Sequence, residues 1–395
     1  MGTWEGYIQI PVGTNFAYIR EGSLDRLKEV DAAIFDCDGV LIDTRDSYRK
    51  SIVETVKYFL SQLTDVELPF DEILRETTYF LKRSGGFNND WDATYAILLF
   101  LFSKMPKDFQ SDFITVTGSK DFIQAETLQK RFDYIKRSVK NRPSHFSESQ
   151  DKILKELKLF AQRTDDSGID SIEKELINSS SGEIVLATKR FLNYPDGAKE
   201  SLLATVFDEM FYGPELFELI YGRKRQFCDK PGFVEIEKEK TLVTLETLTE
   251  LAQVIGRENF GIVSGRDKFS ARFSLGTLLD KFRRDAVLFL MDHNYSKKPF
   301  EEQMKLKKPN PYPLIKSAKG LDQFKYSLYI GDSAEDLIMV KRANEIDRRF
   351  ISVGVYALSD FKDELISFFF SSNTDIILHS IKELPAVLRE VKVRK

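Results

Sequence analysis

Two aspartates separated by one residue follow a short apolar run near the start of the chain. The run Ala32–Phe35 is too short for a helix and is bounded by acidic residues, so it predicts a buried strand. Because side chains alternate along an extended chain, Asp36 and Asp38 would lie on the same side of it. Two such carboxylates repel each other unless a cation or a proton lies between them. Most isolated Asp-x-Asp pairs are simply an acidic strand end that turns into a loop, so the rest of the sequence has to decide.

Further polar residues follow the ends of later predicted strands. The run Phe260–Val263 is followed by Ser264-Gly265-Arg266, and the run Tyr326–Ile330 is followed by Gly331-Asp332-Ser333-Ala334-Glu335-Asp336. Before the second of these runs lies Lys308-Pro309-Asn310-Pro311. In parallel sheets, ligands bind at the carboxyl ends of the strands. The predicted edge therefore gathers up to four acids, a hydroxyl beside a glycine, and a lysine held by prolines.

These residue types together suit phosphoryl transfer. Carboxylates are the ligands that Mg²⁺ prefers, and the ion would relieve their mutual repulsion. An aspartate beside Mg²⁺ and a lysine can attack phosphorus and form an aspartyl-phosphate. A neighbouring carboxylate can exchange protons with the leaving oxygen and with water. Serine and lysine would neutralise and orient the phosphoryl oxygens, which is most of what this reaction requires.

The middle of the chain predicts helices. From about Asp46 to Lys240, apolar residues recur at three- and four-residue spacing with charges between them. The expected helices include Ser47–Leu63, Phe70–Lys82, Trp91–Lys104, Lys120–Lys140, Gln150–Arg163 and Ser171–Ile177. This part of the chain would form one helical domain.

Helices and strands alternate in the last part of the chain. The expected helices are Leu242–Ile255, Phe269–Phe282, Pro313–Lys319 and Asp336–Asn344. The expected strands are Phe260–Val263, Ala286–Met291, Tyr326–Ile330, Phe350–Val355 and Asp375–Leu378. Such alternation predicts a parallel sheet with crossover helices, to which Ala32–Phe35 also belongs. The helical domain is therefore inserted after the first strand of an α/β domain.

The expected domains have definite boundaries. Two alternating runs about a Gly/Asn turn predict an N-terminal hairpin extension at residues 1–21, followed by a short helix with Ser23 as its N-cap. The α/β core would take residues 22–45 and 241–395, and the helical domain residues 46–240. Two domains are also expected because 395 residues exceed one usual core.

The amino-acid composition limits which class of protein the chain can be and which metal ions it can bind. Hydrophobic content of 42% and charged content of 30% describe a globular protein, and a net charge of −4 gives no general attraction to nucleic acid or to an anionic membrane. Cys37 and Cys228 are the two cysteines, so neither a disulfide framework nor a thiolate zinc site is expected. With three widely separated histidines, any metal should be a hard cation held by carboxylates.

The N-terminus lacks the features of a signal peptide, and the longest apolar block is too short to cross a bilayer. That block, Ala96–Phe102, is expected to be a buried helix. A cytoplasmic location is the resulting expectation.

The motifs resemble those of a known superfamily. Asp36-Cys37-Asp38-Gly39-Val40-Leu41, Ser264-Gly265-Arg266, Lys308-Pro309-Asn310-Pro311 and Gly331-Asp332-Ser333-Ala334-Glu335-Asp336 stand in the order of the four motifs of the haloacid dehalogenase (HAD) superfamily. The inserted helices resemble the C1 cap of its phosphoglycolate-phosphatase-like subfamily. The resemblance covers roughly residues 30–390. It implies a Rossmann-like parallel-sheet core with a large inserted α-helical cap.

The resemblance also implies catalytic roles by position. Asp36 would be the nucleophile and a Mg²⁺ ligand. Asp38 would be the acid/base and would give the metal its backbone carbonyl. Ser264 would hydrogen-bond the transferring phosphoryl group, and Lys308 would offset charge on the nucleophile and on the phosphoryl oxygens.

Metal and phosphate contacts follow in the same way. Asp332 would ligate Mg²⁺, and Asp336 would ligate it through water or support the ligands. Contacts to the phosphate are expected from Gly39, Ser264, Gly265, Arg266 and Lys308. For Arg266 two interpretations stay open, because its guanidinium could reach either the phosphate or a cap carboxylate.

The acid at position 38 separates activities within the superfamily. Haloacid dehalogenases lack it and P-type ATPases have a threonine there, whereas phosphatases and phosphomutases keep it. The implied activity is Mg²⁺-dependent hydrolysis of a small phosphomonoester through phospho-Asp36. A phosphomutase, a phosphonate hydrolase with a Schiff-base lysine in the cap, and a non-catalytic regulatory protein are the alternatives. The expected partner is a small phosphorylated metabolite, without nucleic acid or membrane, and no oligomeric state is predicted.

Overall fold

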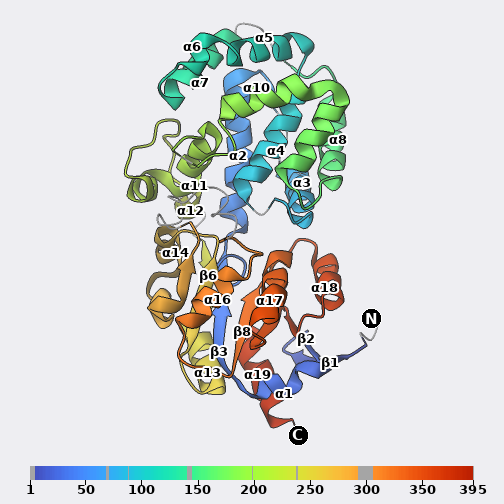
Figure 1. Ribbon diagram of the computed structural model, residues 1–395, viewed down its shortest axis with the longest axis vertical. Coiled ribbons are helices and arrows are strands. Elements are labelled where there is room, and N and C mark those ends of the chain that lie inside the picture. The colour runs from blue at the N-terminus through green and yellow to red at the C-terminus, as the bar shows by residue number, and fades with distance from the viewer. Residues whose placement is uncertain are drawn as a thin grey trace. The chain divides into compact units, whose positions relative to one another are not determined.

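The computed structural model describes residues 5–67, 71–87, 89–139, 145–197, 199–236, 239–291 and 306–394. The chain divides by its internal contacts into two compact units (Figure 1). Met1–Arg45 and Lys238–Lys395 form one, which we call the α/β unit, and Asp46–Glu237 form the other, the helical unit.

The α/β unit is built on an eight-stranded sheet with strand order β1-β2-β10-β9-β8-β3-β6-β7. The strands are β1 (Tyr7–Val12), β2 (Asn15–Arg20), β3 (Val30–Phe35), β6 (Phe260–Ser264), β7 (Val287–Phe289), β8 (Tyr326–Gly331), β9 (Phe350–Val355) and β10 (Ile376–Leu378). From β10 to β7 all neighbouring strands are parallel. The predicted α/β class, with a Rossmann-like parallel sheet and a helical insertion, is confirmed, and β3 lies inside the sheet between β8 and β6.

Strand β3 is apolar on both faces because helices cover both sides of the sheet. Ala33 and Phe35 belong to one cluster of buried side chains, whereas Ala32 and Ile34 belong to another. Each of these four residues is fully buried. A continuous apolar run is what a strand covered on both faces requires.

Helices of the α/β unit supply the two covering layers. They are α1 (Leu24–Lys28), α13 (Leu245–Ile255), α14 (Lys268–Leu275), α16 (Tyr312–Lys319), α17 (Ala334–Ile346), α18 (Lys362–Ser371) and α19 (Leu384–Val393). Short 3₁₀ segments are η1 (Glu21–Ser23), η3 (Gly276–Lys281), η4 (Arg284–Ala286) and η5 (Ile381–Glu383). Buried residues of α13 and α19 share a cluster with Phe35, and buried residues of α16 and α17 share the other with Ile34.

The N-terminal hairpin continues the main sheet. β1 and β2 are antiparallel partners, as the Gly/Asn turn predicts. β2 also pairs with β10, with Ile19 opposite Ile376. The hairpin predicted at residues 1–21 therefore forms the edge of the eight-stranded sheet.

The helical unit consists of helices around its own apolar core. They are α2 (Arg45–Leu63), α3 (Asp71–Arg83), α4 (Asp90–Ser103), α5 (Lys107–Thr117), α6 (Lys120–Ile123), α7 (Leu128–Val139), α8 (Gln150–Gln162), α9 (Ile169–Leu176), the π-helical segment η2 (Ile177–Ser181), α10 (Gly182–Leu192), α11 (Leu202–Tyr221) and α12 (Phe233–Ile236). The single helix expected over Lys120–Lys140 is wrong, because the chain breaks between α6 and α7. The expected ends at Phe70 and Lys140 lie outside the described residues.

Helix α4 is the centre of the helical unit. It starts where the side chain of Asn89 accepts the N–H of Trp91 at 3.0 Å. Every residue from Ala93 to Phe102 is buried, so the apolar block is a core helix, as predicted. No described helix of the chain is both long enough and apolar enough to cross a membrane.

A two-stranded ladder joins the segments on either side of the helical unit. β4 (Ile42–Asp43) pairs antiparallel with β5 (Lys240–Thr241), and the N–H of Leu242 donates to the carbonyl of Leu41 at 2.8 Å. Both strands belong to the α/β unit. The helical periodicity assigns Lys240 to the helical domain, whereas the internal contacts of the chain place it in the α/β unit.

Candidate active site

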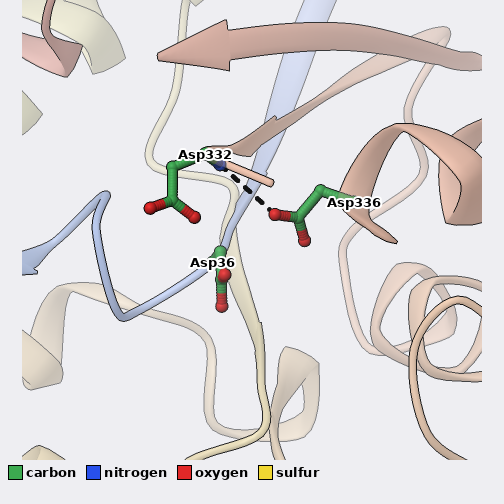
Figure 2. A group of neighbouring side chains, drawn as sticks. All are labelled: Asp36, Asp332 and Asp336. Atoms are coloured by element: carbon green, nitrogen blue, oxygen red, sulfur yellow. Dashed lines mark hydrogen bonds between the residues drawn. The ribbon is translucent and has the colours of Figure 1, made fainter. Parts of the chain in front are cut away.

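Three carboxylates meet where two neighbouring strands end. β3 and β8 are parallel, with Phe35 opposite Ile330, and the N–H of Asp36 donates to the carbonyl of Ile330 at 2.8 Å. Asp332 follows β8 directly, and Asp336 lies in the first turn of α17. Figure 2 shows the three side chains grouped at this edge, and one oxygen of each lies within 4.8 Å of the others.

Lys308 supplies the positive charge of this carboxylate group. Its Nζ lies 2.8 Å from Oδ1 of Asp36 and 2.8 Å from Oδ1 of Asp336, and its side chain is 8% exposed. Burial opposes the charge, yet the two carboxylates raise the pKa of Lys308 well above its usual value. The lysine therefore lies between two acids, and its expected contact with a phosphoryl oxygen stays a prediction.

Asp336 is fixed on both carboxylate oxygens. Oδ1 accepts the hydroxyl of Tyr329 at 2.9 Å as well as Lys308. Oδ2 accepts the hydroxyl of Ser333 at 2.7 Å and the N–H groups of Ser333 and Asp332 at 3.1 and 3.2 Å, the last drawn as the dashed line in Figure 2. Burial alone would raise the pKa of Asp336, but Lys308 and these donors hold it below its usual value. These donors hold the carboxylate of Asp336 in place, and the metal-supporting role expected for it stays a prediction.

Among the described residues, the positive charge of Lys308 does not offset the burial of Asp36 and Asp332. Burial raises the pKa of Asp36 to about 7, although Lys308 opposes the shift. Burial, together with the charges of Asp36 and Asp336, raises the pKa of Asp332 well above its usual range. Buried oxygens that crowd one another in this way fit a hard divalent cation such as Mg²⁺. The residues present therefore suit the metal that the sequence predicts.

The backbone at Gly39 lies directly against one of these carboxylates. Gly39 has a φ of +77°, and a Cβ placed there would lie 1.8 Å from Oδ2 of Asp332. Only glycine allows both this conformation and this close approach. The loop after Asp38 is thus shaped around the carboxylate of Asp332.

Asp38 is not one of these three carboxylates, and its side chain binds an arginine. Its Oδ1 accepts a hydrogen bond from Nη1 of Arg266 at 2.8 Å, and its side chain is 28% exposed. The structure thus gives Asp36 and Asp38 different cationic partners. The backbone-carbonyl contact from Asp38 to a metal stays a prediction.

Ser264 ends β6, the other neighbour of β3, so it lies at the same edge of the sheet. Its hydroxyl is nearly buried and accepts the N–H of Arg266 at 3.2 Å. A Cβ at Gly265 would meet no heavy atom within 4 Å. The phosphate contacts expected from Ser264, Gly265 and Gly39 stay predictions.

Arg266 is bound to protein carboxylates. In addition to Asp38 it contacts Glu239, through Nη1 at 3.3 Å and through Nη2. The sequence does not single out Glu239, because it lies in the run Glu235-Ile236-Glu237-Lys238-Glu239-Lys240, where charges alternate as on a solvated surface. The pairing of β5 with β4 brings it to this site, and local spacing carries no signal for that.

Comparison with known proteins supports the fold. No protein-family model and no curated protein match the sequence. An X-ray structure of a Northeast Structural Genomics Consortium target is similar to the chain with a TM-score of 0.62 and 17% identity, over 91% of this chain and 99% of that one. The phosphatase Tt82 from Thermococcus thioreducens gives a TM-score of 0.47 and 18% identity, over 90% of this chain and 98% of its own. At such identity, the first likeness shows a shared fold.

Proposed function

We propose that the chain is a Mg²⁺-dependent phosphatase of the HAD type, with a C1 cap, which hydrolyses a small phosphorylated metabolite through phospho-Asp36. One observation carries the proposal. Asp36, Asp332 and Asp336 converge at the ends of β3 and β8, with the Lys308 ammonium bound to two of them. Phosphoryl transfer requires a nucleophilic carboxylate, carboxylates that can bind a metal ion, and a fixed cation.

In the first step, an oxygen of Asp36 attacks phosphorus. The new bond joins Asp36 to phosphorus, and the bond from phosphorus to the leaving oxygen breaks. Asp38 gives its proton to that leaving oxygen, so an alcohol departs and Asp38 is left as a carboxylate. The partly exposed position of Asp38 supports this role, because the group that accepts the proton arrives from solvent.

In the second step, water attacks the phosphorus of phospho-Asp36. Asp38 takes a proton from the water, the bond from phosphorus to Asp36 breaks, and inorganic phosphate is released. Asp36 returns as a carboxylate and Asp38 returns in its protonated form. The same two side chains therefore close the cycle without a further reactant.

The remaining residues bind and orient. Asp36, Asp332 and the backbone carbonyl of Asp38 would hold Mg²⁺, which when bound supplies positive charge to the phosphoryl oxygens. Lys308 would neutralise a phosphoryl oxygen while it keeps Asp36 in place. Ser264 would donate its hydroxyl to the phosphoryl group.

The test is hydrolysis of p-nitrophenyl phosphate by the purified protein with Mg²⁺. Wild-type protein should release nitrophenol, EDTA should stop turnover, and added Mg²⁺ should restore it. Asp36→Asn should reduce the rate to background, whereas Asp25→Asn, whose side chain is exposed, should leave it unchanged. Activity that survives Asp36→Asn would overturn the phospho-Asp36 mechanism.

Two further outcomes would separate the alternatives. Absence of activity on every phosphoester tried would favour a non-catalytic binding role. A requirement for a bisphosphate activator would favour a phosphomutase. A screen of phosphorylated metabolites would then identify the substrate.

A further inference from the structure

The guanidinium of Arg266 lies between two carboxylates. Its side chain is 0% exposed. Nη1 donates to Oδ1 of Asp38 at 2.8 Å and to Oε1 of Glu239 at 3.3 Å, while Nη2 donates to Oε2 of Glu239. Glu239 thus takes one N–H from each terminal nitrogen, in the forked geometry that arginine and carboxylate form best. To contact a phosphoryl group, the guanidinium would have to leave at least one of these partners.

Helix α14 fixes the plane of this guanidinium. Nε donates to the hydroxyl of Ser270 at 3.0 Å, and Nη2 lies 3.4 Å from the hydroxyl of Ser274. Residues four apart share one face of a helix, so both serines reach the same group. Ser270 is itself bound to Asp267, the N-cap of α14, and Ser274 donates to Glu239 at 2.6 Å. Every nitrogen of the guanidinium therefore has a protein partner.

Glu239 is placed beside Asp38 by strand pairing. It precedes β5 directly, and β5 pairs with β4. The loop that carries Asp38 is closed onto β4, because the N–H of Gly39 donates to the carbonyl of Ile42 at 2.8 Å. The side chain of Glu239 is 1% exposed, so it is held inside the α/β unit.

The three charged side chains differ in what can reach them. Arg266 and Glu239 are 0% and 1% exposed, whereas Asp38 is 28% exposed. A ligand that arrives from solvent therefore meets Asp38, and Arg266 and Glu239 lie behind it. General acid–base catalysis depends on the position of the carboxyl group that moves the proton.

We propose that Arg266 and Glu239 are positioning residues for Asp38, and that Arg266 acts through Asp38 without contacting the phosphoryl group. The inference rests on the proposed function. Glu239 orients the guanidinium through its fork, and Nη1 then holds Asp38 at Oδ1. Asp38 is thereby kept at one orientation for proton transfer to the leaving group.

The test uses leaving groups that differ in their need for a proton. p-Nitrophenyl, phenyl and benzyl phosphate carry similar rings, but their alcohols become progressively less acidic. The measured quantity is kcat/KM, which covers the steps up to cleavage of the bond to the leaving oxygen. If Asp38 is no longer correctly placed as the acid, hydrolysis of benzyl phosphate should slow most and hydrolysis of p-nitrophenyl phosphate least.

Arg266→Lys keeps the charge and removes the fork. We expect kcat/KM to fall about tenfold more for benzyl phosphate than for p-nitrophenyl phosphate, because general acid catalysis contributes on the order of a hundredfold or more. Glu239→Gln should also lower kcat/KM more for benzyl phosphate than for p-nitrophenyl phosphate, but by a smaller factor. This second variant tests the proposal even if Arg266→Lys does not fold. Arg272→Met is the matched control, since Arg272 lies on α14 with its side chain 51% exposed. This variant should have the wild-type kcat/KM for all three substrates.

A double-mutant cycle separates the two possible sites of action. If Arg266 acts through Asp38, then Arg266→Lys should cause no further loss in an Asp38→Asn background. A loss equal for all three esters that persists in that background would overturn the inference and assign Arg266 to the phosphoryl group. Failure of the wild-type protein to hydrolyse any ester would instead overturn the proposed function, and this inference with it.

Discussion

Asp36 and Asp38 are separated by one residue, yet their surroundings differ. Asp36 is buried and shares Lys308 with Asp336. Asp38 is partly exposed and is bound by Arg266. Their identical side chains are therefore suited to different tasks, since a buried carboxylate beside a cation can attack phosphorus, and an exposed carboxyl group can exchange a proton with a leaving group or with water.

Gly39 offers a test of how tightly the loop is fitted to Asp332. In Gly39→Ala, a Cβ would overlap Oδ2 of Asp332, and alanine disfavours a φ of +77°. We expect the variant to be destabilised by about 1–3 kcal/mol and to require more Mg²⁺ for activity. Thermal unfolding and a Mg²⁺ titration of the rate measure the two effects.

Gly22→Ala is the control, because a Cβ at Gly22 meets no heavy atom within 4 Å. It should behave as the wild type in both measurements. A Gly39→Ala variant with unchanged Mg²⁺ dependence would show that the loop does not control the position of Asp332.

At the scale of elements, Asp375 ties the N-terminal hairpin to the sheet. Its carboxylate, which directly precedes β10, accepts hydrogen bonds from Arg20 at the end of β2 and from Ser23 and Arg26 around α1. It also accepts the N–H and the hydroxyl of Ser352 in β9, each at 2.9 Å. One buried acid therefore holds two strands and a helix. Ser23 is at the N-cap of α1, as predicted, but its hydroxyl makes no capping bond and binds Asp375 instead.

The pKa of Asp375 predicts how the free energy of unfolding depends on pH. Burial would raise the pKa of Asp375, but hydrogen bonds from Arg20, Ser23 and Ser352 hold it below its usual value. A lowered folded-state pKa contributes stability that is present above the unfolded pKa of about 3.9 and is lost as the pH falls through the folded-state pKa. Asp375→Asn should lower the free energy of unfolding by about 3 kcal/mol at pH 7, as expected when one partner of a buried ion pair is removed.

The difference in thermal midpoint between wild type and Asp375→Asn should be constant above about pH 5 and should shrink below about pH 4. Circular dichroism across this range measures it. Asp25→Asn, an exposed acid of α1, should show no such difference. A difference in thermal midpoint that stays constant down to low pH would contradict a lowered pKa of Asp375.

At the scale of the whole molecule, the helical unit is one uninterrupted stretch of chain with its own core. The buried side chains of this core lie between Ile52 and Val234. A fragment of residues 46–237, the span Asp46–Glu237, should therefore fold alone, with helical circular dichroism and cooperative thermal unfolding. It should hydrolyse no phosphoester, because the carboxylate group lies outside it.

The matched control is a fragment of residues 46–201, which lacks α11. Helix α11 contributes many buried residues, among them Phe207 and Phe211, to the core of the helical unit. This shorter fragment should lose cooperative unfolding. If the longer fragment is also unfolded, the helical unit depends on the α/β unit for its stability.

The sequence by itself determined most of the elements and the sheet edge at which the carboxylates lie. Apolar spacing depends on which face of an element is buried, and that is a local property, so β3, β6, β8 and most of the expected helices were predictable. Strand ends of a parallel sheet meet at one edge, so Asp36 and Asp332 were predicted to lie together. Lys308 directly follows no predicted strand, and only the order of the motifs placed it with them. Helix α18 is not among the expected helices, although Leu365 and Phe369 lie four residues apart in it.

Only the tertiary structure decided which charged groups pair. Arg266 and Asp38 are separated by 228 positions in the sequence, and Ser23 and Asp375 by 352. Such contacts depend on strand order and register, which no local pattern encodes. Pairing of β5 with β4 brought Glu239 behind Asp38, and pairing of β2 with β10 made the hairpin part of the sheet. The sequence thus supplied two aspartates after a strand, and long-range pairing gave each of them its own partner.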